Sequence, residues 1–206
     1  MSEDEVPRLA PLPREDWDEE VRAAIAAGFG PDAAARLFSD EPDTPRMPNA
    51  LATMAHHPAL TGPWLAYNNV LLGSPSLDPR LRELMVLRVA WRTRSRYEWV
   101  QHVRIARGLE ITGEEVEAIA GLRDTVAWSE LEAAVLAATD QLLDHYRIDD
   151  ATWSRLAEHL DERQLVEVVF VAGTYTCLAM AFRTLGIALD PELADVPAPA
   201  MPRGPG

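Results

Sequence analysis

The sequence contains no lysine, only one cysteine and no apolar run of membrane-spanning length. All 19 basic residues are arginines against 33 acidic ones, giving a net charge of −14. Phosphate neutralisation needs a basic surplus, so we expect no nucleic-acid partner. The lone Cys177 excludes an intramolecular disulfide framework, a Cys-rich zinc site and a CxxC pair. Without a signal-like or spanning segment, we expect a soluble cytoplasmic protein with no membrane partner. The missing lysine indicates composition bias rather than chemistry.

Composition and the positions of prolines and glycines divide the chain into three parts. With 206 residues, 48% of them hydrophobic, it suits one domain or two small ones. Residues 1–45 hold twelve acids, four arginines and repeated prolines, which predicts an acidic arm with one short helix at about 15–27. Residues 46–190 have helical character throughout, and the Pro/Gly-rich residues 191–206 predict a flexible tail.

Capping signals place the helices of the central part. Asp78 before Pro79 predicts a helix start, and capping boxes begin at Thr112 and Ser129. Asp161 with Gln164 predicts a last long helix to Gly186, broken near Gly173. The expected helices cover about 48–56, 58–72, 79–92, 95–108, 112–121, 129–146 and 161–186. No period-2 alternation indicates strands, so the predicted fold class is all-α.

Three polar residues lie on two neighbouring apolar helices. Glu83 falls early in a helix that is apolar nearly all round, while Glu98 and His102 share the inner face of the next one. A tight turn at 92–94 makes the two helices antiparallel, which brings Glu83 level with residues 102–105. We therefore predict that Glu83, Glu98 and His102 converge on a site able to hold and transfer a proton.

Structural alternatives exist for each member of this cluster. Glu83 suits the positive end of a helix dipole, and Glu98 with His102 forms an i, i+4 pair. The same pair offers two metal-ligand types on one helical face. No HExxH motif accompanies it, so we expect neither a metal nor a cofactor.

The chain resembles the carboxymuconolactone decarboxylase family, which also contains the AhpD-type alkylhydroperoxidases. The resemblance lies in R-x-R-E-L-x-x-L-R-V-A (80–90), S-x-Y-E-W-x-x-H-x-x-x-A (95–106) and E-E-V-E-A-I (114–119). It implies an AhpD-like helical fold built around a buried antiparallel hairpin, with an N-terminal extension. It also implies a homo-oligomer, either a trimer or a hexamer.

The sequence departs from the AhpD pattern at both redox positions. AhpD-type members carry C-x-x-C-x-x-x-H, with a glutamate twelve residues before the first cysteine. Aligning His102 with the motif histidine puts Ser95 and Glu98 at the cysteine positions and Glu83 at the glutamate. Serine and glutamate cannot reduce a peroxide through a disulfide, which argues against an alkylhydroperoxidase. Cys177, in an apolar segment, is expected to be an inert core residue.

The resemblance therefore points to the decarboxylase-like branch, a cofactor-free lyase or isomerase. Its substrate would be a small unsaturated lactone or carboxylic acid, with Glu83, Glu98 and His102 as the catalytic residues. We predict that Arg88 and Arg96 hold the acidic substrate and that Ser95 and Tyr97 contribute to binding. The alternative is a non-catalytic helical oligomer that binds a small ligand in the same place.

Overall fold

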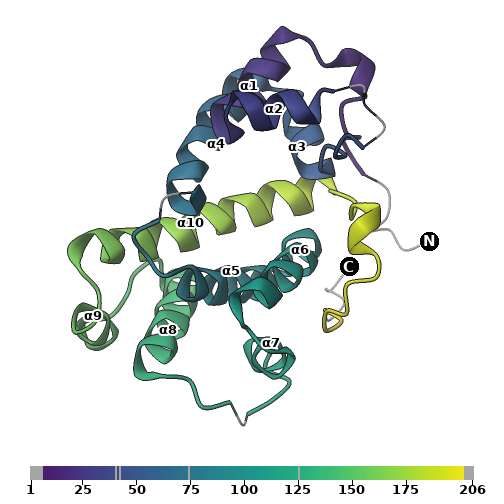
Figure 1. Cartoon of the computed structure of the whole chain (residues 1–206). Coiled ribbons are helices and arrows are strands. Elements are labelled where there is room, and N and C mark those ends of the chain that lie inside the picture. The colour runs from purple at the N-terminus through teal and green to yellow at the C-terminus, as the bar shows by residue number, and fades with distance from the viewer. Residues whose placement is uncertain (1–6, 40, 42, 74, 125, 202–206) are drawn as a thin grey trace. The chain divides into compact units, whose positions relative to one another are not determined.

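The computed structural model describes residues 7–39, 41, 43–73, 75–124 and 126–201. Every regular element in these ranges is a helix, which confirms the predicted all-α class (Figure 1). The chain forms two compact units. Unit 1 comprises residues 1–74 and 184–190, and unit 2 comprises 75–183 and 191–206. This division does not follow the expected border at 45/46, because residues 46–74 belong with the N-terminal segment.

Unit 1 contains more helix than the sequence pattern predicts before residue 45. The single expected helix is replaced by a short 3-10 turn and two helices, because Gly30 interrupts the chain at φ 81° and Pro31 starts a new helix. The Asp18 side chain caps the first of these by accepting from the Val21 amide at 3.0 Å. The elements are η2 (Arg14–Asp16), α1 (Glu19–Phe29), α2 (Pro31–Leu37), α3 (Asn49–Met54) and α4 (Pro58–Gly73).

The core of unit 1 forms where α1 packs against α4. Ile25 is fully buried there, and Gly28 allows α1 to approach Leu65 of α4 closely. Residues 184–190 join this unit through Asp190, whose carboxylate accepts from the Asn49 amide at 2.8 Å and from Arg46 at 3.3 Å.

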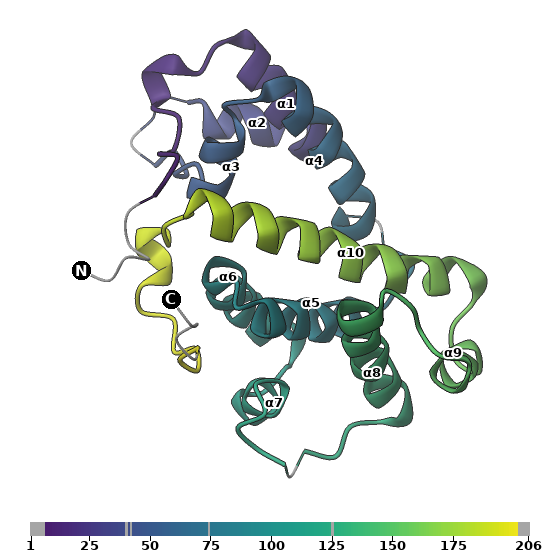
Figure 2. The same ribbon diagram turned by 180° about the vertical axis from the view of Figure 1, so that it is seen from behind.

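Unit 2 is built on the predicted antiparallel hairpin of α5 (Pro79–Thr93) and α6 (Arg96–Ala106). Asp78 caps α5 by accepting from the Arg80 and Leu81 amides, as its place before Pro79 predicts. Arg94 ends α5 in the left-handed conformation at φ 57°, which produces the tight turn before α6. α10 lies alongside this hairpin in both views (Figures 1 and 2).

The remaining helices of unit 2 are α7 (Gly113–Ile119), α8 (Glu130–His145), α9 (Asp150–Ala157) and α10 (Glu162–Leu185). Both predicted capping boxes are present, at Thr112 for α7 and at Ser129 for α8. α9 was not expected; Asp149 caps it by accepting from the Thr152 amide. α10 continues through Gly173 without the predicted break.

Arginines of α5 connect the hairpin to α7 and α8. Arg80 donates to Glu115 and Glu132, the two capping-box glutamates, and thereby joins three helices. Arg92 donates to Asp140 and Asp144 on α8. These arginines therefore neutralise acids of neighbouring helices within the same unit.

α10 is the one helix in the described ranges that is long and apolar enough to cross a membrane by length and composition. Half of its most apolar 18-residue stretch is buried inside the protein. Its outer side bears Cys177, which is exposed, so the expectation of a core cysteine was wrong. Apolar character in TYTCLAMAF reflects a helix that is apolar on both its buried and exposed sides.

The described part of the predicted tail is attached to α6. After η4 (Pro191–Leu193), in which Leu193 is buried, the Pro199 carbonyl accepts from Trp99 Nε1 at 2.9 Å. Residues 202–206 of the predicted flexible tail lie outside the described residues.

Candidate functional site

Glu83 and His102 meet in the interior of unit 2. Glu83 lies in the second turn of α5 and is 1% exposed, while His102 lies late in α6. The antiparallel hairpin brings them together, and His102 Nδ1 lies 2.7 Å from Glu83 Oε1. The predicted convergence of these two residues is thus present in the structure.

This contact leaves the second ring nitrogen of His102 available. With Glu83 ionised, Nδ1–H donates to the carboxylate and the lone pair of neutral imidazole is on Nε2. Nε2 makes no hydrogen bond within the described ranges, and 10% of the His102 side chain is exposed. The imidazole is therefore oriented from one side and able to accept or donate a proton on the other.

Glu98 is the third member of the predicted cluster, and it stands apart from the hydrogen-bonded pair. It is 2% exposed, and neither carboxyl oxygen has a hydrogen-bond partner in the part of the chain that the structure describes. Burial raises the pKa of Glu98 to about 7, although neighbouring Ser95 and the charge of His102 act in the opposite direction. Ser95 Oγ is also buried without a partner of hydrogen-bonding geometry, so it lies beside the carboxyl without binding it. Near neutral pH the carboxyl exists in both protonation states.

Tyr175 and Arg82 belong to the same cluster but were not predicted. Tyr175 of α10 is 3% exposed, and its ring lies edge-on to the His102 imidazole with centroids 5.1 Å apart. Burial and the negative charges of Glu83 and Glu98 raise the pKa of Tyr175, while Arg82 lowers it. Arg82, on α5 next to Glu83, is itself buried. Arg82 could have been predicted, because it precedes Glu83 in the R-E-L motif. Tyr175 could not, because it lies 73 residues from His102 in the sequence and no local pattern links the two.

The predicted substrate-binding residues have other surroundings. Arg88 forms a bidentate ion pair with Asp140 on α8, in which both hydrogen bonds are 2.8 Å long. It also donates a hydrogen bond to the Ile119 carbonyl. Arg96 is exposed at the start of α6. Tyr97 is buried and packs edge-on against Phe182 of α10. Of the predicted binding set, Ser95 is the residue found beside the Glu98 carboxyl.

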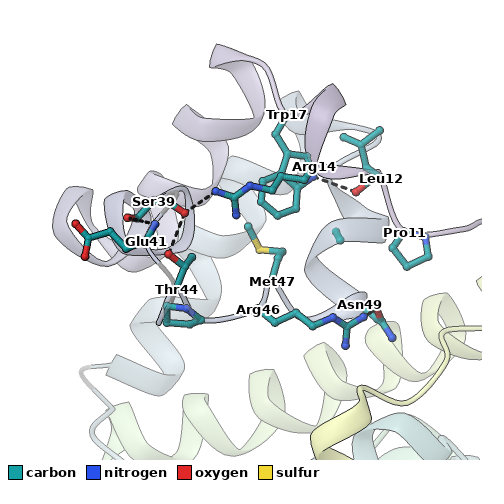
Figure 3. Close-up of a pocket in the computed structure, with 12 residues that line it drawn as sticks. Pro11, Leu12, Arg14, Trp17, Ser39, Glu41, Thr44, Arg46, Met47 and Asn49 are labelled. Carbon is teal, nitrogen blue, oxygen red and sulfur yellow. Dashed lines mark hydrogen bonds between the residues drawn. The ribbon is translucent and has the colours of Figure 1, made fainter.

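Metal ligands do not gather in the described ranges: no three His, Cys, Asp or Glu side chains are placed to hold one ion. A pocket of about 460 Å³ lies in unit 1 (Figure 3). Met47 and Trp17 give it an apolar lining, and Arg14 crosses it to donate to the Ser39 carbonyl.

The arrangement of the helices is of the AhpD-like all-helical class. Residues 58–141, which contain Glu83, Glu98 and His102, match the Carboxymuconolactone decarboxylase family. This match covers the hairpin and its acid–base residues, and solved structures of AhpD-like proteins share the fold. No curated protein sequence matches it.

Several solved structures share this fold. An alkylhydroperoxidase AhpD core protein, peroxidase-related, from Ralstonia eutropha JMP134 has 18% identity and a TM-score of 0.69, covering 90% of this chain and 94% of its own. A peroxidase-related protein from Silicibacter sp. TM1040 has 18% identity and a TM-score of 0.64, with coverage of 72% and 79%. The debrominase Bmp8 has 15% identity and a TM-score of 0.67, with coverage of 90% and 93%.

Proposed function

We propose that this protein is a cofactor-free lyase or isomerase that moves a proton on a small unsaturated lactone or carboxylic acid. The observation that carries the proposal is the 2.7 Å contact between Glu83 and His102, which leaves Nε2 without a hydrogen-bond partner among the described residues. A buried carboxylate that orients an imidazole is an arrangement suited to general acid–base catalysis.

For decarboxylation the chemistry runs in two steps. The C–C bond to the substrate carboxylate breaks, CO2 leaves, and the electron pair passes into a conjugated carbonyl to form a dienolate. His102, protonated on both nitrogens, then gives its Nε2 proton to the distal carbon and takes another from solvent. Glu83 stabilises the imidazolium in the first state and fixes the neutral tautomer in the second. Isomerisation uses the same proton transfer without the loss of CO2.

Redox chemistry of the AhpD type is not supported by the residues at the motif positions. Ser95 and Glu98 replace the two cysteines, and Cys177 lies on a different helix, α10. A small unsaturated ring as substrate is supported by the fold itself. A variant of the debrominase Bmp8 has been crystallised with 2,3,4-tribromopyrrole, so a protein of this fold can hold such a ring.

The test is turnover of a panel of unsaturated lactone acids, followed by CO2 release and by the absorbance of the conjugated product. His102→Ala should abolish turnover with the helical circular dichroism retained. His159→Ala, at an exposed histidine after α9, is the matched control and should keep wild-type rates. Turnover by His102→Ala at the wild-type rate would overturn the proposal. Binding of a lactone acid without turnover would support the alternative, a non-catalytic ligand-binding oligomer.

We also propose a cytoplasmic homo-oligomer, a trimer or a hexamer. The exposed apolar side chains of α10 support self-association, because Val166, Phe170 and Met180 are each more than half exposed, at 56%, 51% and 61%. The single cysteine is consistent with a reducing compartment. Light scattering of the purified chain tests the oligomeric state, and a monomer would exclude it.

A further inference from the structure

Two buried side chains remain unexplained once Glu83 and His102 are assigned to proton transfer. Glu98 has two carboxyl oxygens without a partner at 2% exposure, and Tyr175 lies against the His102 ring at 3% exposure. Buried polar atoms without partners carry a free-energy penalty of about 1–3 kcal/mol each, so such groups usually have a role. Neither residue contributes a hydrogen bond to the orientation of His102.

Both groups are hydrogen-bond donors at neutral pH or below. Burial and the charges of Glu83 and Glu98 raise the pKa of Tyr175, which keeps its hydroxyl protonated. Burial raises the pKa of Glu98 to about 7, so a large fraction of this carboxyl is protonated below that pH. A protonated carboxylic acid has an O–H to donate, which an ordinary surface glutamate lacks at this pH.

Tyr175 lies beside the imidazole that is proposed to transfer the proton. Its ring lies edge-on to the His102 ring, with the ring centroids 5.1 Å apart. Glu98 lies one helical turn before His102 on α6. Both therefore lie around the imidazole that would deliver the proton.

We propose that Tyr175 and the protonated form of Glu98 donate hydrogen bonds to the substrate oxygen on which negative charge accumulates. This inference rests on the proposed function and adds the substrate class to it: a substrate whose reaction passes through an enolate or dienolate oxygen. Donors fixed in a site of low dielectric constant stabilise such an oxygen more than water does. The substrate oxygen in turn satisfies the buried donors, and the proton itself still travels through His102.

The charged or titratable groups that act on Glu98 are His102 on its own helix and Tyr175 on α10. Arg82 and Glu83 of α5 act on Tyr175 in turn. His102 takes part in the proposed proton transfer as well. A pH profile of the wild type alone therefore does not separate the two groups, and Glu98→Gln is needed because glutamine stays neutral at every pH.

The catalytic arm of the test compares Tyr175→Phe with Tyr146→Phe in the turnover assay. Tyr175→Phe keeps the edge-on ring and loses only the donor, and we expect kcat to fall about 10²-fold with KM changed far less. Tyr146 is 89% exposed, and its phenylalanine variant should match the wild type. A Tyr175→Phe enzyme within threefold of wild-type kcat overturns the inference while leaving His102 and the proposed function intact.

The binding arm needs no turnover and uses pentafluorophenolate, a small oxyanion that stays ionised from pH 6.5 to 8.5, followed by fluorine NMR. Tyr175→Phe should weaken binding at least tenfold, and Tyr146→Phe should not. Wild-type affinity should fall by about tenfold more across this pH range than that of Glu98→Gln, because only the wild type loses the Glu98 proton. Equal pH dependence in both proteins overturns the role of Glu98. No binding together with no turnover by the wild type overturns this inference and the proposed function together.

Discussion

Nδ1 of His102 and Oε1 of Glu83 lie 2.7 Å apart, across 19 residues of sequence and two antiparallel helices. Glu83 is 1% exposed, so its carboxyl group is partnered inside the protein rather than by water. An isolated buried carboxylate costs several kcal/mol, which makes this contact a condition for the hairpin as well as for the site. One pair of atoms thus couples the packing of α5 and α6 to the orientation of the imidazole.

Replacement of Glu83 by glutamine should reduce turnover more than it perturbs the fold. Glutamine has the same size, but it carries no charge to stabilise the imidazolium. It can also present either its amide oxygen or its amide NH2 group to Nδ1. We expect kcat to fall by about 10²-fold or more. Nitrogen-15 NMR of labelled histidine should show a mixture of tautomers in place of one.

The matched control is Glu114→Gln, a carboxylate in the first turn of α7 whose side chain is 69% exposed. This variant should keep the wild-type rate. A Glu83→Gln enzyme with an unchanged rate and a single tautomer would remove Glu83 from the proton-transfer pair.

Stability should fall with rising pH because of Glu98. Burial raises the pKa of this carboxyl from 4.5 to about 7, so the folded protein binds the proton more tightly than the unfolded chain. The stabilisation is complete below the unfolded value and is lost as the pH rises through about 7. The rise in pKa corresponds to about 3 kcal/mol. Urea unfolding should be measured at pH 5 and pH 8.5. Between these two values, the unfolding free energy of Glu98→Gln should increase by up to that amount relative to that of the wild type.

Glu158→Gln is the control for this measurement, because Glu158 is an exposed residue at the end of α9. Its stability relative to the wild type should be nearly the same at both pH values. A Glu98→Gln variant that parallels the wild type from pH 5 to 8.5 would show that Glu98 titrates normally.

The sequence predicted the parts of the fold that local rules determine. Asp78 before Pro79 and the capping boxes at Thr112 and Ser129 start helices where expected, since capping involves residues within one turn. Glu83 and His102 were predicted to meet because the turn at Arg94 fixes the register of two antiparallel helices.

Local sequence rules do not predict contacts between segments that are far apart in the sequence. Arg88 was assigned to the substrate, but its partner Asp140 is 52 residues away, and only tertiary structure brings α8 beside α5. Tyr175 was missed for the same reason, because its contact with His102 depends on the packing of α10. Apolar residues around Cys177 predicted burial, whereas this side of α10 is exposed in the single chain. The roles of Glu98, Arg96 and Tyr97 in catalysis or binding stay predictions.

Removal of the Arg80 side chain should destabilise unit 2. Arg80 donates to Glu132 at 2.9 Å and to Glu115, and so connects α5 with the first turns of α7 and α8. Its side chain is 27% exposed, and both glutamates are 15% exposed, so these pairs are largely shielded from water. We expect Arg80→Ala to lower the free energy of unfolding by about 1–3 kcal/mol in urea. Lysine should not restore it, because it lacks the forked donor geometry.

Arg147→Ala provides the comparison for this pair. Arg147 and Asp150 also form an ion pair, but their side chains are 75% and 95% exposed. Its loss should cost at most about 0.5 kcal/mol. Equal effects of the two alanine variants would mean that the Arg80 network does not hold the helices together.

Two glycines inside helices should respond to alanine in opposite directions. A Cβ at Gly28 of α1 would lie 2.5 Å from Leu65 Cβ on α4, while a Cβ at Gly173 of α10 meets nothing within 4 Å. Alanine gains up to about 1 kcal/mol of helix propensity at either site. At Gly28 the overpacking cost of about 1–3 kcal/mol exceeds this gain, so the variant should unfold at lower urea. Gly173→Ala should be more stable than the wild type. If the two units unfold separately, only the urea midpoint of unit 2 should rise.

Shortening Leu65 to alanine should not rescue Gly28→Ala, because alanine keeps the Cβ atom that causes the clash. Rescue by that double variant, or stabilisation by Gly28→Ala alone, would contradict the close approach of α1 to α4.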